Sequence, residues 1–473
     1  MRRLAWTAVF LAACSGNDRQ SGPPVVIVDA GSTRDAGTDE PPRDAGAADA
    51  GSRDGAVRDA GPHDGGTRDG GTRDAGTRDG GSTPACAWPL GAPLGNGVNP
   101  PPRRDHAIAA DPECRRVLIF GGNDAVPNNC APTAANYLGD FYTYDFATNA
   151  WYTQPVASGV EPGPRARAGA VWDPMRRRFV MFGGRYRAGT TGNYTHYDEL
   201  WAYDVTTQTW SPLVSGAPAS PSPRMGFVME ADPTRDRFVL HGGGEATSLE
   251  FIPQNDTWAY SYALADWSRI GLTSAPPGRL LHAGALDSAA GHLDIFGGGD
   301  ENAFFGFRAE AWRLDFGTDT WTQHPMGPGE RAFTHMVHDA DSGASVVFGG
   351  NTAEQIGIDN DLWRLAGSPP TWTRVRQGDV YANPARGFCD FPGDFTTADL
   401  ASPERRDGAG FVAVSSSEAI LFGGRSDCGV LNDTWHLDLS TNTWTEQVVS
   451  DAGLTCPRRP GASCVGANSN LCE

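Results

Sequence analysis

The chain has 473 residues and a formal net charge of −19, and all 38 basic residues are arginine because the sequence contains no lysine. The absence of lysine excludes Schiff-base chemistry and a P-loop lysine. The acidic balance disfavours binding to nucleic acid or anionic lipid by charge attraction. Abundant glycine (60) and proline (35), with almost no helical periodicity, predict short strands joined by turns.

The first segment, residues 1–13, has the pattern of a secretion signal. Two arginines precede an apolar run of about ten residues, too short to span a membrane as a stable helix. Its end, Leu11-Ala12-Ala13-Cys14, resembles the lipobox of bacterial lipoproteins. The resemblance implies that Cys14 is lipidated, and Ser15 behind it favours sorting to the outer membrane. The alternative is a plain cleaved signal followed by an unrelated cysteine.

Residues 14–84 are expected to form a disordered tether. Within them, aspartates recur every five residues: Asp39, Asp44, Asp49, Asp54, Asp59, Asp64, Asp69, Asp74 and Asp79. A five-residue period fits neither strand nor helix, and glycine with alternating charge cannot build a core. Its root-mean-square reach would be roughly 40–45 Å. A repeated calcium site is the alternative, but the period differs and an arginine precedes most of the aspartates.

Over residues 85–450 one pattern recurs six times. Each copy has an apolar strand that ends in a glycine pair, whose second member is Gly122, Gly184, Gly243, Gly298, Gly350 or Gly424. Eighteen residues before the first glycine stands an arginine: Arg103, Arg165, Arg224, Arg279, Arg331 and Arg405. An acidic residue follows each pair: Asp140, Glu199, Asp256, Glu310, Asp361 and Asp433. An aromatic residue comes two positions later: Tyr142, Trp201, Trp258, Trp312, Trp363 and Trp435. A tryptophan closes each copy: Trp151, Trp210, Trp267, Trp321, Trp372 and Trp444.

Each copy is predicted to form four short strands. The glycines fit backbone positions that need positive φ or close approach by a neighbour. A single four-stranded sheet leaves apolar faces in water, whereas stacking copies around an axis buries them with aromatic side chains in between. Pairing with the acidic residues explains the six arginines as framework. The alternative is an arginine ring near the axis that binds an anion.

The repeat resembles the kelch repeat over roughly residues 88–446. The resemblance implies an all-β, six-bladed kelch-type β-propeller of the galactose-oxidase-like central-domain kind, preceded by the disordered linker. Copy five departs from the pattern at Ala366, and Gly378–Pro403 is inserted before copy six. A seventh tryptophan, Trp88, is expected to lie on a surplus outer strand that helps to close the ring.

Eight cysteines besides Cys14 predict disulfides in an exported chain. The loop positions that kelch topology implies favour the pairs Cys86–Cys114 and Cys389–Cys428, with Cys130 on the same face as the second pair. The remaining three lie in a cysteine-rich tail, residues 451–473, at spacings that suit loop staples better than zinc.

Catalytic motifs are missing from the sequence, and no catalytic residue, metal or cofactor is expected. His335 and His338 stand three apart on a predicted strand and would point to opposite faces. His106 and His282 occupy a repeat position where packing is favoured over catalysis. Neither a Gly-x-Ser-x-Gly elbow nor a His-Glu-x-x-His motif occurs.

Candidate ligand contacts follow the glycine pairs, at positions that differ from copy to copy: Asn123, Arg185, Tyr186, Asn351 and Arg425. Three long insertions open on the same face: Asn123–Leu138, Arg185–Tyr197 and Gly378–Pro403. The sequence therefore predicts a monomeric binding module, lipid-anchored to the bacterial envelope, whose partner is a protein or a glycan. A carbohydrate-active propeller enzyme (epimerase-like or oxidase-like) and a structural cell-surface protein are the alternatives.

Overall fold

The computed structural model describes residue 86 and residues 88–451, except 125–126, 129–130, 133–135, 158, 190–192, 214–218, 248–250, 303–305, 353–356, 382–394, 398 and 427–428. The expected signal, the tether and the tail beyond residue 451 therefore lie outside the described residues, as do Cys14, Cys130, Cys389 and Cys428. Within the described part, no helix is long and apolar enough to span a membrane.

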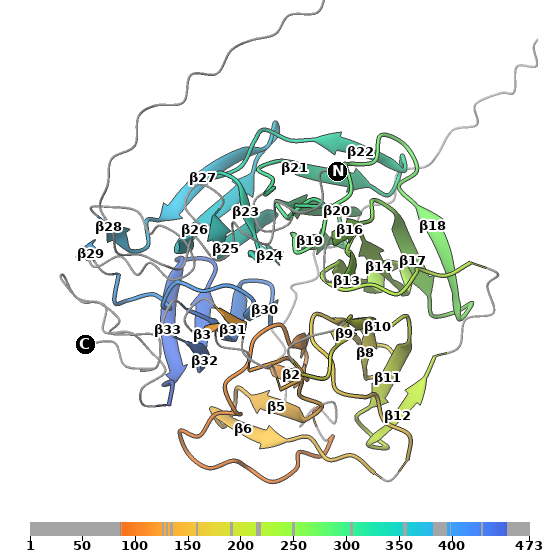
Figure 1. Cartoon of the computed structure of the whole chain (residues 1–473), viewed down its shortest axis with the longest axis vertical. Helices are drawn as coiled ribbons and strands as arrows, with labels where there is room; N and C mark the ends of the chain where they lie inside the picture. The colour runs from red at the N-terminus through yellow and green to blue at the C-terminus, as the bar shows by residue number, and fades with distance from the viewer. Residues whose placement is uncertain are drawn as a thin grey trace, which may run out of the picture. The chain divides into compact units, whose positions relative to one another are not determined.

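Six antiparallel sheets are arranged in a ring around a central axis (Figure 1). The first three blades are β1(Ala107–Asp111)-β2(Arg116–Phe120)-β5(Phe141–Asp145)-β6(Ala150–Thr153), β7(Gly169–Asp173)-β8(Arg178–Phe182)-β11(Leu200–Asp204)-β12(Thr209–Pro212) and β13(Val228–Asp232)-β14(Arg237–His241)-β17(Thr257–Ser261)-β18(Asp266–Ile270). The last three are β19(Ala283–Asp287)-β20(His292–Phe296)-β21(Ala311–Asp315)-β22(Thr320–Gln323), β24(His335–Asp339)-β25(Ala344–Thr352)-β26(Gly357–Ala366)-β27(Thr371–Arg376) and β30(Gly410–Ala413)-β31(Glu418–Arg425)-β32(Val430–Asp438)-β33(Thr443–Val448). The predicted six-bladed propeller is confirmed.

Short two-stranded hairpins form in the loops between second and third strands of blades one to three and in the connection between blades five and six. The two-stranded hairpins are β3(Pro127–Asn128) with β4(Ala131–Pro132), β9(Arg185–Tyr186) with β10(Thr195–His196), β15(Gly244–Ala246) with β16(Phe251–Pro253), and β28(Val380–Tyr381) with β29(Phe395–Thr397). The pair β28–β29 belongs instead to the connection between blades five and six. A short strand β23(Arg331–Ala332) pairs with β25, and a 3-10 turn η2(Pro233–Arg235) joins β13 to β14.

The core between blades is built from aromatic pairs. The closing tryptophan of each blade packs on the residue that precedes the glycine pair of the blade before it. The centroid distances are 4.6 Å for Trp151–Phe422, 5.4 Å for Trp210–Phe120, 5.4 Å for Trp267–Phe182, 4.7 Å for Trp321–His241, 5.1 Å for Trp372–Phe296 and 4.9 Å for Trp444–Phe348. The repeat therefore encodes the interface between blades as well as the blade itself.

The framework arginines bind the repeat's acidic residues, as predicted. In blade three, Arg224 donates to the carbonyl of Gly242 at 3.0 Å and to Asp256 at 2.6 Å. Asp256 also accepts a hydrogen bond from the indole of Trp258 at 2.7 Å. A buried guanidinium is thus satisfied by one carboxylate and by carbonyl oxygens, which is the condition for burying a charge at low cost.

Blade six corrects one prediction, because its framework arginine is Arg406 and not Arg405. Arg406 donates to the Gly423 carbonyl at 2.9 Å and to both oxygens of Asp433, at 2.6 and 2.7 Å. The first hairpin of this blade is one residue shorter, since Gly410 pairs with Phe422 whereas Ala107 pairs with Phe120 in blade one. A fixed spacing from the glycine pair therefore selected the neighbouring arginine.

Blade four departs from the framework pattern. Arg279 donates to the Gly297 carbonyl at 3.0 Å, but its Nη2 has no hydrogen-bond partner. The acidic residue of this blade, Glu310, instead lies 3.8 Å from Arg308. Burial, only partly opposed by Glu310, lowers the pKa of Arg279 to about 10.

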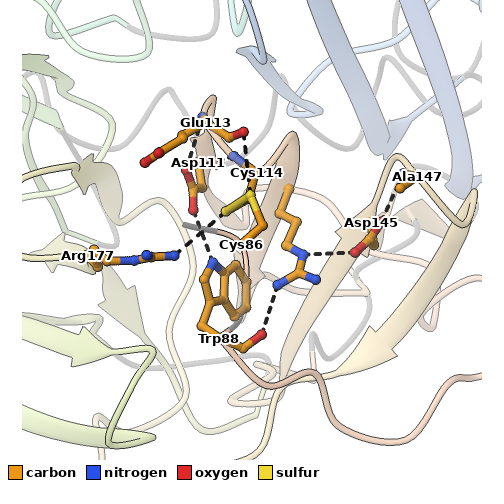
Figure 2. Close-up of a disulfide and its surroundings, with 9 residues drawn as sticks. Cys86, Trp88, Asp111, Glu113, Cys114, Asp145, Ala147 and Arg177 are labelled. Carbon is orange, nitrogen blue, oxygen red and sulfur yellow. Dashed lines mark hydrogen bonds and ion pairs between the residues drawn. A yellow bond between two sulfur atoms is a disulfide. The ribbon is translucent and has the colours of Figure 1, made fainter. Parts of the chain in front are cut away.

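The segment before the first blade lies along its outer edge. Pro93 bridges to Tyr152 of β6, but the expectation that Trp88 itself lies on an outer strand is wrong. Trp88 belongs to no strand, and its ring stacks on Trp172 of the innermost strand of blade two, with centroids 6.4 Å apart. Figure 2 shows Cys86 and Cys114 joined in a disulfide, with Cα atoms 5.1 Å apart. Nearby, the indole of Trp88 donates to Asp111 at 3.1 Å.

The ring closes between blades six and one. Each blade uses four strands from one continuous copy, so closure depends on packing and hydrogen bonds between two complete sheets. Asn99 donates to the carbonyl of Val449 at 2.7 Å, and Asn432 donates to that of Pro100 at 3.0 Å. These contacts anchor the two ends of the repeat to each other.

Candidate functional site

A collar of backbone hydrogen bonds surrounds the axis on the face that carries the second-to-third loops. Its members lie two positions after each framework arginine: Asp105, Arg167, Gly226, Leu281, Phe333 and Gly408. All have positive φ, from 53° at Phe333 to 63° at Gly226. Because this conformation costs a non-glycine residue about 1–2 kcal/mol, the surrounding structure must enforce it.

Hydrogen bonds between neighbouring blades supply that enforcement. The amide of one collar residue donates to the carbonyl of the preceding one: Asp105 to Gly408 at 2.7 Å, Arg167 to Asp105 at 2.7 Å, Gly226 to Arg167 at 3.1 Å, Leu281 to Gly226 at 2.6 Å and Phe333 to Leu281 at 2.8 Å. The collar thus holds side chains from different blades close to the axis. Asp105, Arg167, Leu281 and Phe333 are therefore presented together.

Charged side chains gather at one side of the collar, over blades six, one and two. We call this group the mouth cluster: Arg104, Asp105, Arg167, Arg185, Asp407 and Arg425. The carboxylate of Asp105 forms ion pairs with Arg167 and Arg104, whose Nε atoms lie 3.0 and 3.3 Å from its Oδ2. Asp407 lies 3.3 Å from Arg104 and pairs with Arg425. Although burial alone would raise it, the neighbouring arginines hold the pKa of Asp105 below its ordinary value.

The mouth cluster holds four arginines and two aspartates, so its formal charge is +2. Within the part of the chain that the structure describes, Arg185 is the member that forms no ion pair with a carboxylate, and only 9% of its surface is exposed. Its guanidinium lies over the ring of Tyr194, 4.0 Å from the centroid. Burial, followed by repulsion from Arg167, lowers the pKa of Arg185 to about 10.

The rest of the collar is apolar. Leu281, with Met225 and Phe307, belongs to a buried cluster against which Phe333 and Tyr194 pack. Arg167 and Arg104 also lie over the ring of Phe333, at 5.0 and 5.7 Å from its centroid. This face therefore presents cationic and aromatic groups side by side, a combination enriched at binding surfaces.

A cavity of about 650 Å³ runs along the axis between the first strands of the blades. Its walls are mainly apolar, and Glu230 on β13 lines it together with Asp287 and four histidines. Burial raises the pKa of Glu230 to about 8, so its carboxyl is largely protonated at neutral pH. Among the described residues, no group of three or more His, Cys, Asp or Glu side chains is placed to hold a metal ion.

The histidines near the axis are packed between blades. Burial lowers the pKa of His106 to about 3, and its ring lies 5.4 Å from that of Phe422. His282 packs on His241 at 5.5 Å. His338 lies 3.4 Å from Asp287 on blade four, whereas the charges acting on His335 come from Asp407 and Arg406 on blade six and from Asp105 on blade one. The two histidines of β24 thus face different neighbours, as predicted.

The structure brings together only part of the set predicted from sequence. Asn123 donates to Asp105 at 3.2 Å, and Arg185 and Arg425 belong to the mouth cluster. The ring of Tyr186 lies edge-on to Tyr137 at 5.3 Å. Asn351 is fully buried on β25 of blade five, and Figure 1 shows this blade across the ring from β9, the strand that holds Arg185. Among the described residues, neither polar atom of its amide has a partner.

Sequence reasoning missed Arg104, Asp105, Arg167 and Asp407, which complete the mouth cluster. They could have been found from their positions, one or two residues after a framework arginine, where the charge of the side chain differs from copy to copy. The described ends of the insertion Gly378–Pro403 are held by Asn360 of β26. Asn360 donates to Pro403 at 2.9 Å and accepts from the amide of Asp379 at 2.8 Å.

The blades and their repeat define a β-propeller whose glycine pairs, framework arginines and closing tryptophans are those of kelch repeats. A family model described as the KLHDC2/KLHL20/DRC7 Kelch-repeats domain matches residues 87–283, which form blades one to three. The chain carries a kelch-repeat β-propeller.

Three proteins illustrate the similarity. The chain is 27% identical over 265 residues to putative adagio-like protein 2 of Oryza sativa subsp. japonica, covering 54% of this chain and 36% of that protein. It is 27% identical over 165 residues to Kelch domain-containing protein 1 of Homo sapiens, covering 34% and 37%. It is 26% identical over 306 residues to a xyloglucanase of Paenibacillus sp, covering 59% and 27%. The chain spans about a third of the length of these curated relatives.

Proposed function

We propose that the protein is a tethered binding module that captures a protein or glycan partner through the face bearing the mouth cluster. A kelch propeller is a fold suited to interaction, because its loops vary on a rigid scaffold. The observation that carries the proposal is the excess of buried positive charge in the mouth cluster. Five framework arginines are neutralised by their own acidic residues, whereas Arg185 is left for a partner.

The tether is the second part of the proposal. Lipidation of Cys14 in the Leu11-Ala12-Ala13-Cys14 motif would anchor a monomeric propeller to the outer membrane, on a segment long enough to give it reach. Replacement Cys14→Ser should then release the protein from the membrane fraction or block its processing. An unchanged distribution between membrane and soluble fractions would disprove the anchor.

A face-specific comparison tests the binding surface. The full-length protein serves as bait for envelope extracts and glycan arrays, beside variants Tyr186→Ala on the mouth-cluster face and Leu264→Ala on the opposite face. Leu264 lies in the turn between β17 and β18, and 77% of its surface is exposed. We expect Tyr186→Ala to weaken capture and Leu264→Ala to leave it unchanged. Equal capture by both variants would contradict this choice of face.

A carbohydrate-active enzyme is the second candidate, favoured by Glu230 in the axial cavity. A carboxyl that stays protonated at neutral pH is suited to act as a general acid. The similarity to a protein named xyloglucanase agrees with a sugar substrate. Incubation with xyloglucan should then release reducing ends, and Glu230→Gln should abolish the release. No product from the unaltered protein would exclude this substrate.

A further inference from the structure

The mouth cluster carries more positive charge than its own carboxylates neutralise. Asp105 is shared by Arg104 and Arg167, and it also accepts from Asn123. Asp407 is shared by Arg104 and Arg425. Neither aspartate forms an ion pair with Arg185. A buried guanidinium that lacks an anionic partner is destabilising, so the mouth cluster is suited to accept a further anion.

The loop that holds Arg185 and the corresponding loop of blade one do not provide the missing charge, and Glu245 on β15 of blade three forms no ion pair with Arg185. Residues 185–197 contain no aspartate or glutamate, and residues 123–138 contain only Asp124. Asp124 is already engaged by the amide and the side chain of Asn136, both at 2.8 Å. Among the described residues nothing accepts a hydrogen bond from the guanidinium of Arg185, and its Nε is enclosed without a partner.

Tyrosines surround the unpaired guanidinium. The guanidinium carbons of Arg185 and Arg187 lie 4.0 and 4.4 Å from the ring centroid of Tyr194. Tyr137 and Tyr186 pack on each other, and the charge of Arg185 acts on Tyr137. All three tyrosines remain partly exposed. An anion bound at Arg185 would therefore lie beside aromatic rings.

From this combination we propose that Arg185, assisted by Arg167, forms a carboxylate-binding subsite for an acidic sugar residue, such as a uronate within a polysaccharide. A uronate carries its carboxylate directly on the pyranose ring. A single sugar unit can therefore pair with the guanidinium through its carboxylate and contact the tyrosines through its ring. Aspartate and glutamate side chains of a protein carry no ring for the tyrosines to contact. The inference rests on the proposed binding function and gives its partner a chemical class.

The test uses the full-length protein with three probes at 50 mM NaCl: hexagalacturonate, its fully methyl-esterified form, and hexaglutamate. Titration calorimetry should show binding of hexagalacturonate alone. Esterification removes the charge and keeps the ring, whereas hexaglutamate keeps the charge and lacks the ring. Binding of hexaglutamate without hexagalacturonate would overturn the assignment to a sugar, and absence of binding by both would overturn the subsite.

Variant Arg185→Gln should bind hexagalacturonate roughly 10- to 100-fold more weakly, because a charge-assisted hydrogen-bonded pair is lost. Arg269→Gln is the matched control, since it removes the same charge from an exposed position on β18. We expect that control to bind within about twofold of the unaltered protein. Equal weakening by both variants would show that only the overall charge matters and would overturn the subsite.

Thermal unfolding gives a second readout. Without ligand, Arg185→Gln should raise Tm, because it removes an unpaired buried charge. Saturating hexagalacturonate should raise the Tm of the unaltered protein and not that of the variant. A variant with lowered Tm would contradict the unpaired state of Arg185. If hexagalacturonate does not bind while Tyr186→Ala still weakens capture of another partner, the proposed binding function is supported and the assignment of an acidic sugar is overturned.

Discussion

Trp151 of the first blade packs on Phe422 of the sixth, with ring centroids 4.6 Å apart, and its indole donates to Thr434 at 2.9 Å. The same pairing joins every neighbouring pair of blades, but here it joins the beginning of the repeat to its end. The two sheets share no strand, so this aromatic contact is a main element of closure. The stability of the ring should therefore depend strongly on it.

Replacement Trp151→Ala should lower the free energy of unfolding by about 3–5 kcal/mol, because a fully buried indole leaves a cavity. The control is Trp372→Ala, which removes the equivalent but partly exposed tryptophan between blades four and five. Urea unfolding followed by tryptophan fluorescence measures both. A cost for Trp372→Ala as large as that for Trp151→Ala would contradict a special role in closure.

The framework arginines should differ in their contribution to stability. Arg406→Gln leaves Asp433 buried without its cation and should cost about 3–5 kcal/mol. Arg279→Gln removes only hydrogen bonds to carbonyl oxygens, because Glu310 pairs elsewhere, and should cost about 1–2 kcal/mol. Denaturant titration of the two variants compares them. Equal losses would show that the carboxylate contributes little.

The protein should lose stability on mild acidification because of His241. Burial lowers the pKa of His241 to about 3, while in the unfolded chain it titrates near 6.5. Below pH 6.5 this histidine is protonated in the unfolded state but stays neutral in the folded state. The free energy of unfolding therefore falls as the pH is lowered toward 3. His106 and His335, with pKa values of about 3 and 4, add to the same trend.

Replacement His241→Phe isolates this effect, because phenylalanine stands before the glycine pair in the other five blades. Thr257 loses its hydrogen-bond partner at 2.9 Å, so the variant should be less stable by about 1–2 kcal/mol at pH 7. Between pH 7 and pH 5 the variant should lose about 2 kcal/mol less than the unaltered protein. Unfolding free energies at the two pH values measure this difference, and parallel losses would refute the assignment.

The Cys86–Cys114 disulfide should stabilise the domain by about 3–4 kcal/mol, since the two cysteines are 28 residues apart. Cys86→Ser should lose this amount under oxidising conditions, and Cys114→Ser should behave alike. Adding a reductant to Cys86→Ser measures what the other cysteines contribute. If the variant unfolds at the same denaturant concentration as the unaltered protein, the link has no role in stability.

The architecture of this protein was predictable because its determinants are local and repeated. The arginine stands at a fixed offset from the glycine pair, and the acidic residue at a fixed offset from the aromatic residue and the tryptophan, so the blades and their number follow from spacing. The ion pairs inside the blades follow because each copy supplies one arginine and one acidic residue. Spacing failed at Arg405 because one residue is missing from a hairpin of blade six. It also could not show that Arg279 and Glu310 do not pair with each other, since both residue types are present in the expected places.

The propeller and three residues of the candidate surface, Asn123, Arg185 and Arg425, can be predicted from the sequence pattern alone. That Asp105 and Arg167 lie beside these three residues, and that Asn351 does not, depends on how the blades are placed around the ring. The physical reason is the closed ring, which brings blade six beside blade one and sets blade five opposite blade two (Figure 1). The unpaired state of Arg185 likewise follows from counting charges across three blades, which no spacing within one copy reveals.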